Sequence, residues 1–399
     1  MLRLVALALT LLTITQDSPI FTRLDKTGLS AAQIDATVNH LIQEGHVTGA
    51  AIALFNHDQL IYLGAYGSRD TERELPLTPD SAMTAASLSK SAFAVLVMQL
   101  VHDQTLNLDK PVYRYLPKPL SEYPRYADLK SDDRYKRLTL RILLDHTSGF
   151  PNWRSLNDDH KLNINFDPGT RFAYSGEGID LAQLVVETVT HQNLTTLMNQ
   201  RIFKPLRMSH TSMTWQPTFE DNFANGYDES GRSLGPERRN QPDAAGSMQT
   251  TPRDYATLLS AIMLGTFLDP LTQREMLKPQ IRIHSAHEFP SLATETTTAN
   301  DPIKLSYGIG WGVYSSPYGR AFFKEGHDEG WRNYALCFAN GTGILIMTNS
   351  SNGEGIFKPL LESLLGKTYV PFEWEGYTPY SELPSPNKPL AKQTPGEID

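Results

Sequence analysis

The most constraining feature of this sequence is a segment near residue 90 that is apolar on every side. Residues 92–101 (AFAVLVMQLV) span almost three helical turns and contain a single polar side chain, Gln99. A helix of this kind has to be enclosed by other elements, because it has no polar face to turn toward water. The 399-residue chain is long enough to enclose it, in two domains or in one large domain with an insertion.

Composition narrows the class of function. The net charge of −8 argues against a nucleic-acid partner, which needs clustered Lys and Arg. The single cysteine, Cys337, excludes an internal disulfide, and we interpret it as a small buried hydrophobic side chain. The 11 histidines show no H-E-x-x-H or paired spacing, so neither a metal nor another cofactor is predicted.

The first residues (MLRLVALALTLLTIT) combine Arg3 with a short apolar run. The run is shorter than the roughly 20 residues that span a bilayer, so we predict a signal peptide over residues 1–18 and export to the periplasm or the medium. The alternative is a cytosolic protein with an apolar N-terminus. We expect no stable membrane span after cleavage, and the oligomeric state stays open.

Secondary-structure patterns predict an α+β fold. Residues 29–47 read as a helix opened by a Ser30/Gln33 capping box, and two strand-like runs joined at Asn56-His57-Asp58 predict a hairpin. Short β-rich runs return between residues 307 and 349, followed by a closing helix at 356–365. We therefore expect a domain over 19–372, in which both ends build one antiparallel sheet flanked by helices around a mostly helical insertion at about 87–300. The Pro-rich residues 373–399 are predicted to form a loosely attached tail.

Ser87 and Lys90 stand at the start of the apolar segment. Three residues apart, they share one face of a helix and lie within side-chain reach. The positive end of the helix favours an anion near Ser87, and it lowers the pKa of a partly desolvated lysine from about 10.4. By itself the pair is also compatible with a helix cap and a solvated lysine.

Further motifs follow this pair in order along the chain. They are LDKPVYRYLP (108–117), LTLRILLDHTSGFP (138–151), PGTRFAYSGEGI (168–179), IFKPLRM (202–208), AAGSMQTTPRDYATLL (244–259), YGIGWGV (307–313) and GHDEGW (326–331). Together they resemble the serine β-lactamase and penicillin-binding superfamily, in its class C-related esterase and D-aminopeptidase branch, over residues 30–366. The resemblance implies the β-lactamase/transpeptidase fold and an acyl-enzyme on Ser87.

The same resemblance implies roles for residues 174–176. Tyr174 matches the tyrosine of the family's Tyr-x-Asn element, and it can act as a base only beside a cation such as Lys90. Gly176 stands where the family usually has Asn, at a position next to the substrate. We expect a backbone group, a water or Glu177 to compensate, or else a site adapted to a different acyl group.

The third family element is assigned to residues 327–330. His327 matches the esterase-like His-x-Gly and is expected to contact the substrate, while Gly330 N–H is expected to form the oxyanion hole with Ser87 N–H. Glu329 adds negative charge there, which disfavours bulky anionic β-lactams. His146, in the motif DHTSGF, is interpreted as structural.

Three functions remain open. The favoured one is a serine hydrolase acting on small-molecule esters or peptides through an acyl-enzyme. The second is a β-lactamase or D-alanyl-D-alanine carboxypeptidase, and the third is a catalytically silent binding or scaffold protein on the same fold. Whether Lys90 or Tyr174 is the acylation base is also left open.

Overall fold

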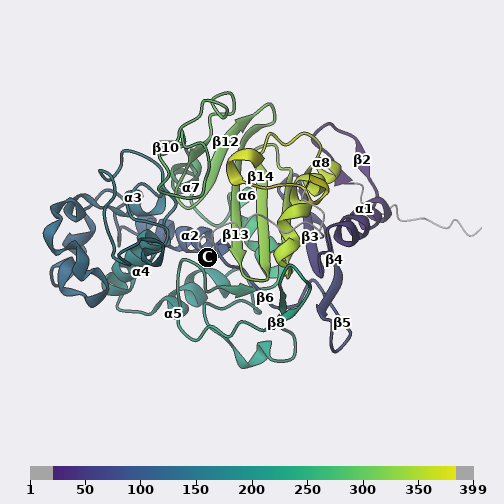
Figure 1. The fold of residues 1–399 in the computed structure, drawn as a ribbon, viewed down its shortest axis with the longest axis horizontal. Coiled ribbons are helices and arrows are strands. Elements are labelled where there is room, and N and C mark those ends of the chain that lie inside the picture. Colours follow the sequence, from purple (N-terminus) through teal and green to yellow (C-terminus); the bar gives the residue numbers. More distant parts are fainter. Residues whose placement is uncertain (1–20, 383–399) are drawn as a thin grey trace, which may run out of the picture.

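A nine-stranded antiparallel sheet organises the molecule, which we describe from a computed structural model covering residues 21–382. Its order is β10-β11-β12-β13-β14-β15-β3-β4-β5, so strands from the two ends of the chain meet where β15 pairs with β3. The strands are β3 (Gly49–Asn56), β4 (Gln59–Asp70), β5 (Leu75–Pro76), β10 (Ile281–Arg282), β11 (Ser306–Tyr307), β12 (Gly312–Ser316), β13 (Gly319–Asp328), β14 (Trp331–Phe338) and β15 (Gly343–Thr348). This is the α+β sheet expected from the sequence (Figure 1).

Helices cover both faces of this sheet. Along β3, Ala51, Ala53 and Phe55 belong to the core shared with α2 and α6, whereas Ile52 and Leu54 belong to the core shared with α1 and α8. Because strand side chains alternate between faces, a central strand in a three-layer arrangement is apolar throughout. The helices are α1 (Ala31–Glu44), α2 (Leu88–His102), α3 (Leu140–Leu144), α4 (Gly176–Thr190), α5 (Leu194–Met198), α6 (Pro252–Met263), α7 (Pro270–Leu277), α8 (Phe357–Leu364) and α9 (Phe372–Glu375).

Local signals at the N-terminal end are confirmed. Gln33 N–H donates to Ser30 Oγ (3.3 Å) and Ser30 N–H donates to Gln33 Oε1 (2.9 Å), which is the predicted capping box of α1. The β3–β4 hairpin turns through His57 and Asp58, whose φ angles of 52° and 64° are the left-handed values that such a two-residue turn requires.

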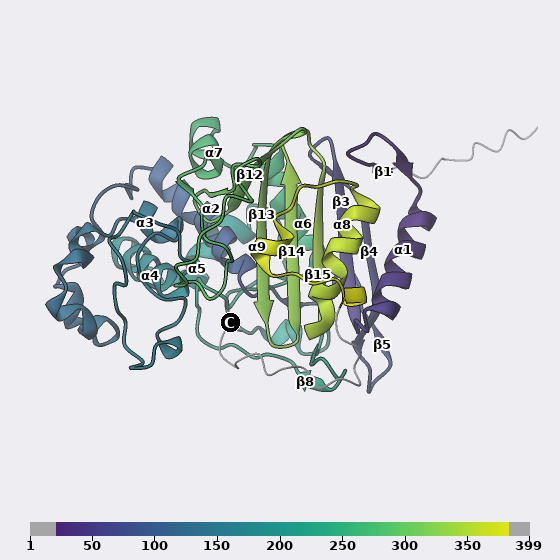
Figure 2. The same ribbon diagram turned by 45° about the horizontal axis from the view of Figure 1, so that its top comes forward.

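The segments that carry α3, α4 and α5 form a lobe beside one edge of the sheet, as Figure 2 shows, whereas α6 packs on the face of the sheet. Three two-stranded pairs complete the strands: β1 (Phe21–Thr22) with β2 (Gly28–Leu29), β6 (Met83–Thr84) with β9 (Gln249–Thr250), and β7 (Gly226–Tyr227) with β8 (Ser233–Gly235). Helix α2 is buried along nearly its whole length between the lobe and the sheet, as its apolar surface demands.

The start of the predicted Pro-rich tail has to be corrected. Residues 373–382 pack against the domain, with Trp374 only 1% exposed and Tyr377 only 6% exposed. Burial of these two large aromatic side chains stabilises the segment against the entropy lost on ordering it, a contribution that the proline count alone conceals. The predicted signal peptide and the tail beyond residue 382 lie outside the described residues.

Candidate active site

Ser87 and Lys90 meet at the N-terminal end of α2 as predicted. Lys90 Nζ donates to Ser87 Oγ over 2.7 Å, and both side chains are buried. Ser87 makes no side-chain capping bond to the helix, which sets aside the simple cap interpretation. The preceding residue, Ala86, has a φ of 47°, a left-handed conformation that costs a non-glycine residue about 1 kcal/mol or more. Strain stored next to the hydroxyl is typical of functional turns.

Lys90 is held from several directions. Its ammonium also donates to the Ala245 carbonyl (2.7 Å), and it lies 5.0 Å from the centre of the Tyr174 ring and 5.8 Å from the centre of the Trp153 ring. A lysine fixed in this way can exchange a proton with Ser87 Oγ without first reorienting.

A second lysine, Lys324, also contacts Tyr174. Lys324 Nζ donates to Tyr174 Oη over 2.9 Å and lies 4.7 Å from the ring centre. Lys324 is fully buried and also forms an ion pair with Glu325, whose pKa stays below its usual range because the neighbouring ammonium outweighs the effect of burial. The Lys324 ammonium, which donates to the phenol oxygen, favours the deprotonated form of Tyr174.

The sequence interpretation missed Lys324. The available signal was the triplet Lys324-Glu325-Gly326, a Lys-x-Gly pattern three residues before His327. Gly326 explains the last position of the triplet: a Cβ there would lie 2.6 Å from the Ala85 carbonyl oxygen and 3.0 Å from Leu88 N. Only glycine lets β13 pass this close to the start of α2. The triplet therefore corresponds to the Lys-Thr-Gly element, with Glu325 in place of threonine.

His327 and Gly330 do not take the places assigned to them from sequence. Since Gly326 faces α2, strand alternation turns His327 to the opposite face, where its Nε2 lies 2.9 Å from Tyr377 Oη and 3.4 Å from the Glu354 carboxylate. Gly330 lies beyond the end of β13, in the turn that leads to β14, where its φ is 80° and its N–H donates to Ser351 Oγ (3.0 Å). The assignment from sequence was three residues out of register, because His327 was aligned at the position that Lys324 occupies.

Gly176 faces a side chain that the sequence interpretation did not consider. A Cβ on Gly176 would lie 2.3 Å from Trp153 Cη2, so the indole occupies the volume of a side chain at this position. Glu177, suggested as a compensating group, turns instead to Arg154 and Arg125.

His146, interpreted from sequence as structural, lies beside Tyr174 in the interior. It is fully buried, its Nδ1 accepts a hydrogen bond from Ser175 N–H (3.2 Å), and its ring packs 4.3 Å from that of Tyr174. Burial, together with the charges of Lys324 and Lys90, lowers its pKa well below the usual value. It supports Tyr174 as a neutral ring.

Across residues 21–382 no three His, Cys, Asp or Glu side chains are grouped so as to hold a metal ion. Within the same residues, no helix has the length and apolar character needed to cross a bilayer.

A serine and a lysine at the start of a buried helix, with a tyrosine and a second lysine beside them, define the class of site. The profile of the Beta-lactamase family matches residues 34–364, and the chain belongs to this family, whose members are serine hydrolases. The resemblance seen in the sequence is confirmed.

Two curated relatives show partial likeness. Protein flp of Staphylococcus aureus (strain MRSA252) is 28% identical over 220 residues, which cover 51% of this chain and 42% of the relative. Esterase EstB of Burkholderia gladioli is 29% identical over 204 residues, which cover 45% of this chain and 50% of the relative. The chain thus matches half or less of the length of these relatives.

Solved structures share the fold over most of the chain. The octameric penicillin-binding protein homologue from Pyrococcus abyssi has a TM-score of 0.69 and 21% identity, covering 85% of this chain and 78% of its own. The D-alanine carboxypeptidase AmpC from Burkholderia cenocepacia has a TM-score of 0.67 and 20% identity, covering 84% and 99%. EstCE1, a hydrolase with promiscuous acyltransferase activity, has a TM-score of 0.67 and 18% identity, covering 84% and 98%. The β-lactamase/transpeptidase-like fold is confirmed.

Proposed function

We propose that this protein is a serine hydrolase that cleaves carboxylic esters through an acyl-enzyme on Ser87. The observation that carries the proposal is the 2.7 Å contact between Lys90 Nζ and Ser87 Oγ at the positive end of α2. A hydroxyl and an amine at this distance need only exchange a proton to yield an alkoxide.

In the proposed reaction, Ser87 Oγ attacks the ester carbonyl carbon and its proton passes to neutral Lys90 Nζ. The negative charge develops on the carbonyl oxygen and is stabilised by backbone N–H groups, each worth about 10²–10³ in rate. One donor is Ser87 N–H. The second comes from β13 beside Gly326, where the strand passes the start of α2, and not from Gly330.

The tetrahedral intermediate collapses when the C–O bond to the alcohol breaks, and the leaving oxygen takes a proton from the Lys90–Tyr174 pair. Water then attacks the acyl-enzyme, losing its proton to the Tyr174 oxygen, which Lys324 holds in place. The bond between the acyl carbon and Ser87 Oγ then breaks, Oγ takes the proton back from Tyr174, and the acid product is released. Lys90 is thus the acylation base, and Tyr174 serves the leaving group and the water.

Charge around Lys324 favours neutral esters over carboxylate-bearing substrates such as β-lactams. Lys324 is the cation nearest to Tyr174 on the β13 side, but Glu325 cancels its charge with a buried ion pair. A substrate carboxylate that does not contact Nζ directly is therefore attracted only weakly by this ion pair, whereas Tyr174 Oη accepts a hydrogen bond from Nζ itself. The likeness to Esterase EstB and EstCE1 supports the same choice, whereas the likeness to AmpC keeps carboxypeptidase activity as the second candidate.

The test is intact-mass spectrometry after incubation with a fluorophosphonate, then with a penicillin, followed by peptide mapping. We expect one fluorophosphonate adduct on Ser87 and hydrolysis of 4-nitrophenyl esters that Ser87→Ala abolishes. A penicillin adduct, or turnover of a chromogenic cephalosporin, would favour the β-lactamase or carboxypeptidase alternative. A folded protein without any adduct would favour the silent scaffold and refute the proposal.

A further inference from the structure

Trp153 lies near the candidate nucleophile, a position that the sequence motifs did not predict. Its indole lies 5.8 Å from Lys90 Nζ, measured to the ring centre, and Lys90 Nζ contacts Ser87 Oγ. The six-membered edge of the same ring fills the space above Gly176, with three ring carbons between 2.3 and 2.6 Å from the position of a Cβ. Trp153 and Gly176 are therefore complementary: the tryptophan fits because residue 176 has no side chain.

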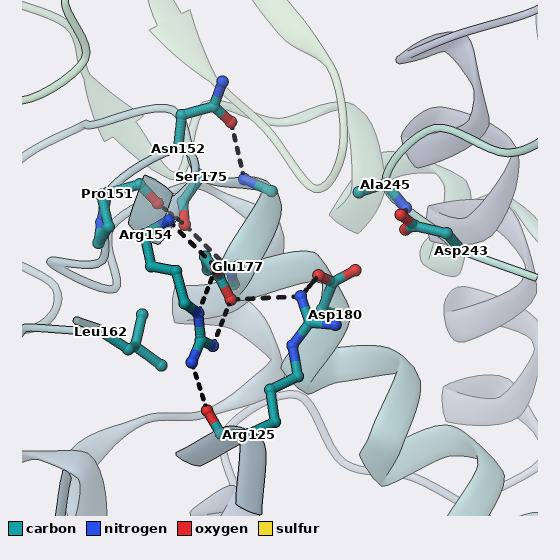
Figure 3. A network of polar contacts seen from close by, with 12 residues as sticks. Arg125, Pro151, Asn152, Arg154, Leu162, Ser175, Glu177, Asp180, Asp243 and Ala245 are labelled. Atoms are coloured by element: carbon teal, nitrogen blue, oxygen red, sulfur yellow. Dashed lines mark hydrogen bonds and ion pairs between the residues drawn. The ribbon is translucent and has the colours of Figure 1, made fainter. Parts of the chain in front are cut away.

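The residues that precede and follow Trp153 are joined to the start of α4 by hydrogen bonds (Figure 3). Before it, Ser175 Oγ donates to the Pro151 carbonyl (2.8 Å), Gly176 N–H donates to Asn152 Oδ1 (3.0 Å) and Glu177 N–H donates to the Asn152 carbonyl (3.1 Å). These bonds set the height of the segment above α4.

After the indole, the buried Glu177 carboxylate accepts from Arg154 N–H (3.1 Å) and from the Arg154 guanidinium at Nε (2.8 Å) and Nη2 (2.7 Å). Arg125 contacts the same carboxylate from the other side (3.3 Å). The Arg154 guanidinium keeps the pKa of Glu177 below its usual range against the opposing effect of burial, so the clamp stays charged at neutral pH. Trp153 is consequently fixed in place by its two neighbours.

The accessible atoms of the Trp153 indole are carbon atoms. Trp153 is partly exposed, whereas its Nε1 is buried and has no hydrogen-bond partner among residues 21–382. A substrate bound at Ser87 therefore meets an aromatic hydrocarbon edge beside Lys90. At Gly176 no side chain projects from the helix, and the nearby Asn152 carboxamide is buried, with its Oδ1 already accepting from Gly176 N–H.

We propose that Trp153 is a specificity-determining residue that forms an apolar wall for the acyl group, so that the site selects esters with hydrocarbon acyl chains over esters whose acyl chain contains an amide. This inference rests on the ester hydrolysis proposed above and names its substrate class. An acyl amide placed against this wall would lose its hydrogen bonds to water without gaining new ones, which is the strongest source of discrimination available to a small site.

Two esters of equal acyl length test the inference. 4-Nitrophenyl pentanoate and 4-nitrophenyl N-acetylglycinate share their leaving group and differ by an amide in the middle of the acyl chain. We compare the ratio of their kcat/KM values, pentanoate over N-acetylglycinate, in the parent, Trp153→Phe, Trp153→Ala, Gly176→Asn and the double variant Trp153→Ala/Gly176→Asn.

We expect the parent and Trp153→Phe to share a ratio well above one, because phenylalanine keeps an apolar ring. Trp153→Ala should lower the ratio. The double variant should lower it further, to about one tenth of the parental ratio or less, because the introduced asparagine then has room and its amide can hydrogen-bond to the acyl amide. Gly176→Asn alone should lose activity or fold poorly, since its side chain collides with the indole, and the double variant separates this collision from the loss of specificity.

Fluorophosphonate labelling of Ser87 is measured in every variant. If Trp153→Ala and the double variant label normally and keep the parental ratio within about twofold, Trp153 does not determine specificity and the ester hydrolase proposal stands. If the parent is labelled but prefers the N-acetylglycinate, the inference is refuted in the same way. If the parent neither labels nor hydrolyses either ester, the proposed function fails, and this inference fails with it.

Discussion

Lys324 donates a hydrogen bond from Nζ to Tyr174 Oη over 2.9 Å, and this contact joins the centre of the sheet to the start of α4. Tyr174 thus lies between two buried lysines, Lys90 on α2 and Lys324 on β13. Three segments far apart in the sequence contribute one group each, and the phenol links them.

Removal of the Lys324 ammonium should impair turnover. We expect Lys324→Met to lower kcat for 4-nitrophenyl esters by about 10²-fold, because the Tyr174 oxygen loses the cation that stabilises its negative charge. Steady-state kinetics with fluorophosphonate labelling give the measurement, and Lys204→Met, at an exposed lysine, is the matched control. An unchanged kcat in a folded, labelled variant would show that Tyr174 works without this lysine.

Glu325 should govern the response to substrate charge. Replacement by Gln leaves the Lys324 ammonium without its ion-pair partner. The Coulomb energy lost is about 4 kcal/mol for a close pair at an effective dielectric constant of 20. We expect Glu325→Gln to destabilise the fold and to raise kcat/KM for anionic 4-nitrophenyl succinate relative to 4-nitrophenyl butyrate. The ratio of the two kcat/KM values tests this, and a ratio equal to the parental one would rule out charge cancellation as the basis of ester preference.

Asp243 should position Lys90 through the loop that carries its carbonyl acceptor. Its Oδ1 accepts from Ala245 N–H (2.7 Å; both residues are labelled in Figure 3), and the Ala245 carbonyl accepts from Lys90 (2.7 Å). We expect Asp243→Ala to lower kcat by about 10–10²-fold, since small misplacements of catalytic groups have effects of this size. Asp243→Asn keeps an acceptor oxygen and should retain most of the activity. Equal losses in the two variants would point to the charge rather than to the hydrogen bond.

Asp145 makes stability depend on pH. Burial raises the pKa of this carboxyl to about 7, although Thr147 Oγ donates to it. The folded protein therefore binds a proton more tightly than the unfolded chain, whose carboxyl titrates near 3.9. The contribution of this group to stability is complete below that pH and is lost as the pH rises through about 7.

The variant Asp145→Asn mimics the protonated acid and does not titrate. We expect it to become more stable relative to the parent between pH 5 and pH 8, by up to about 3 kcal/mol at 1.4 kcal/mol per pKa unit. Chemical denaturation at each pH measures the difference, and the exposed Asp158→Asn should show none. Parallel stability profiles for parent and Asp145→Asn would exclude Asp145 as the source.

Sequence patterns were sufficient for elements whose signal is local. The capping box of α1 and the β3–β4 hairpin depend on residues within a few positions of one another, and each was confirmed. Ser87 and Lys90 belong to the same group, because a spacing of three on a helix brings their side chains together regardless of the rest of the chain.

The family, the sheet built from both ends of the chain, and the Ser87–Lys90 pair follow from sequence patterns. Which side chains surround that pair depends on how distant segments pack against one another. Lys324 and not His327 faces Tyr174, because the close passage of β13 at Gly326 fixes which residues turn toward α2. Trp153 fills the space above Gly176 because hydrogen bonds from α4 hold its neighbours. These contacts join residues far apart along the chain, and a sequence pattern does not show how far apart such residues lie in space.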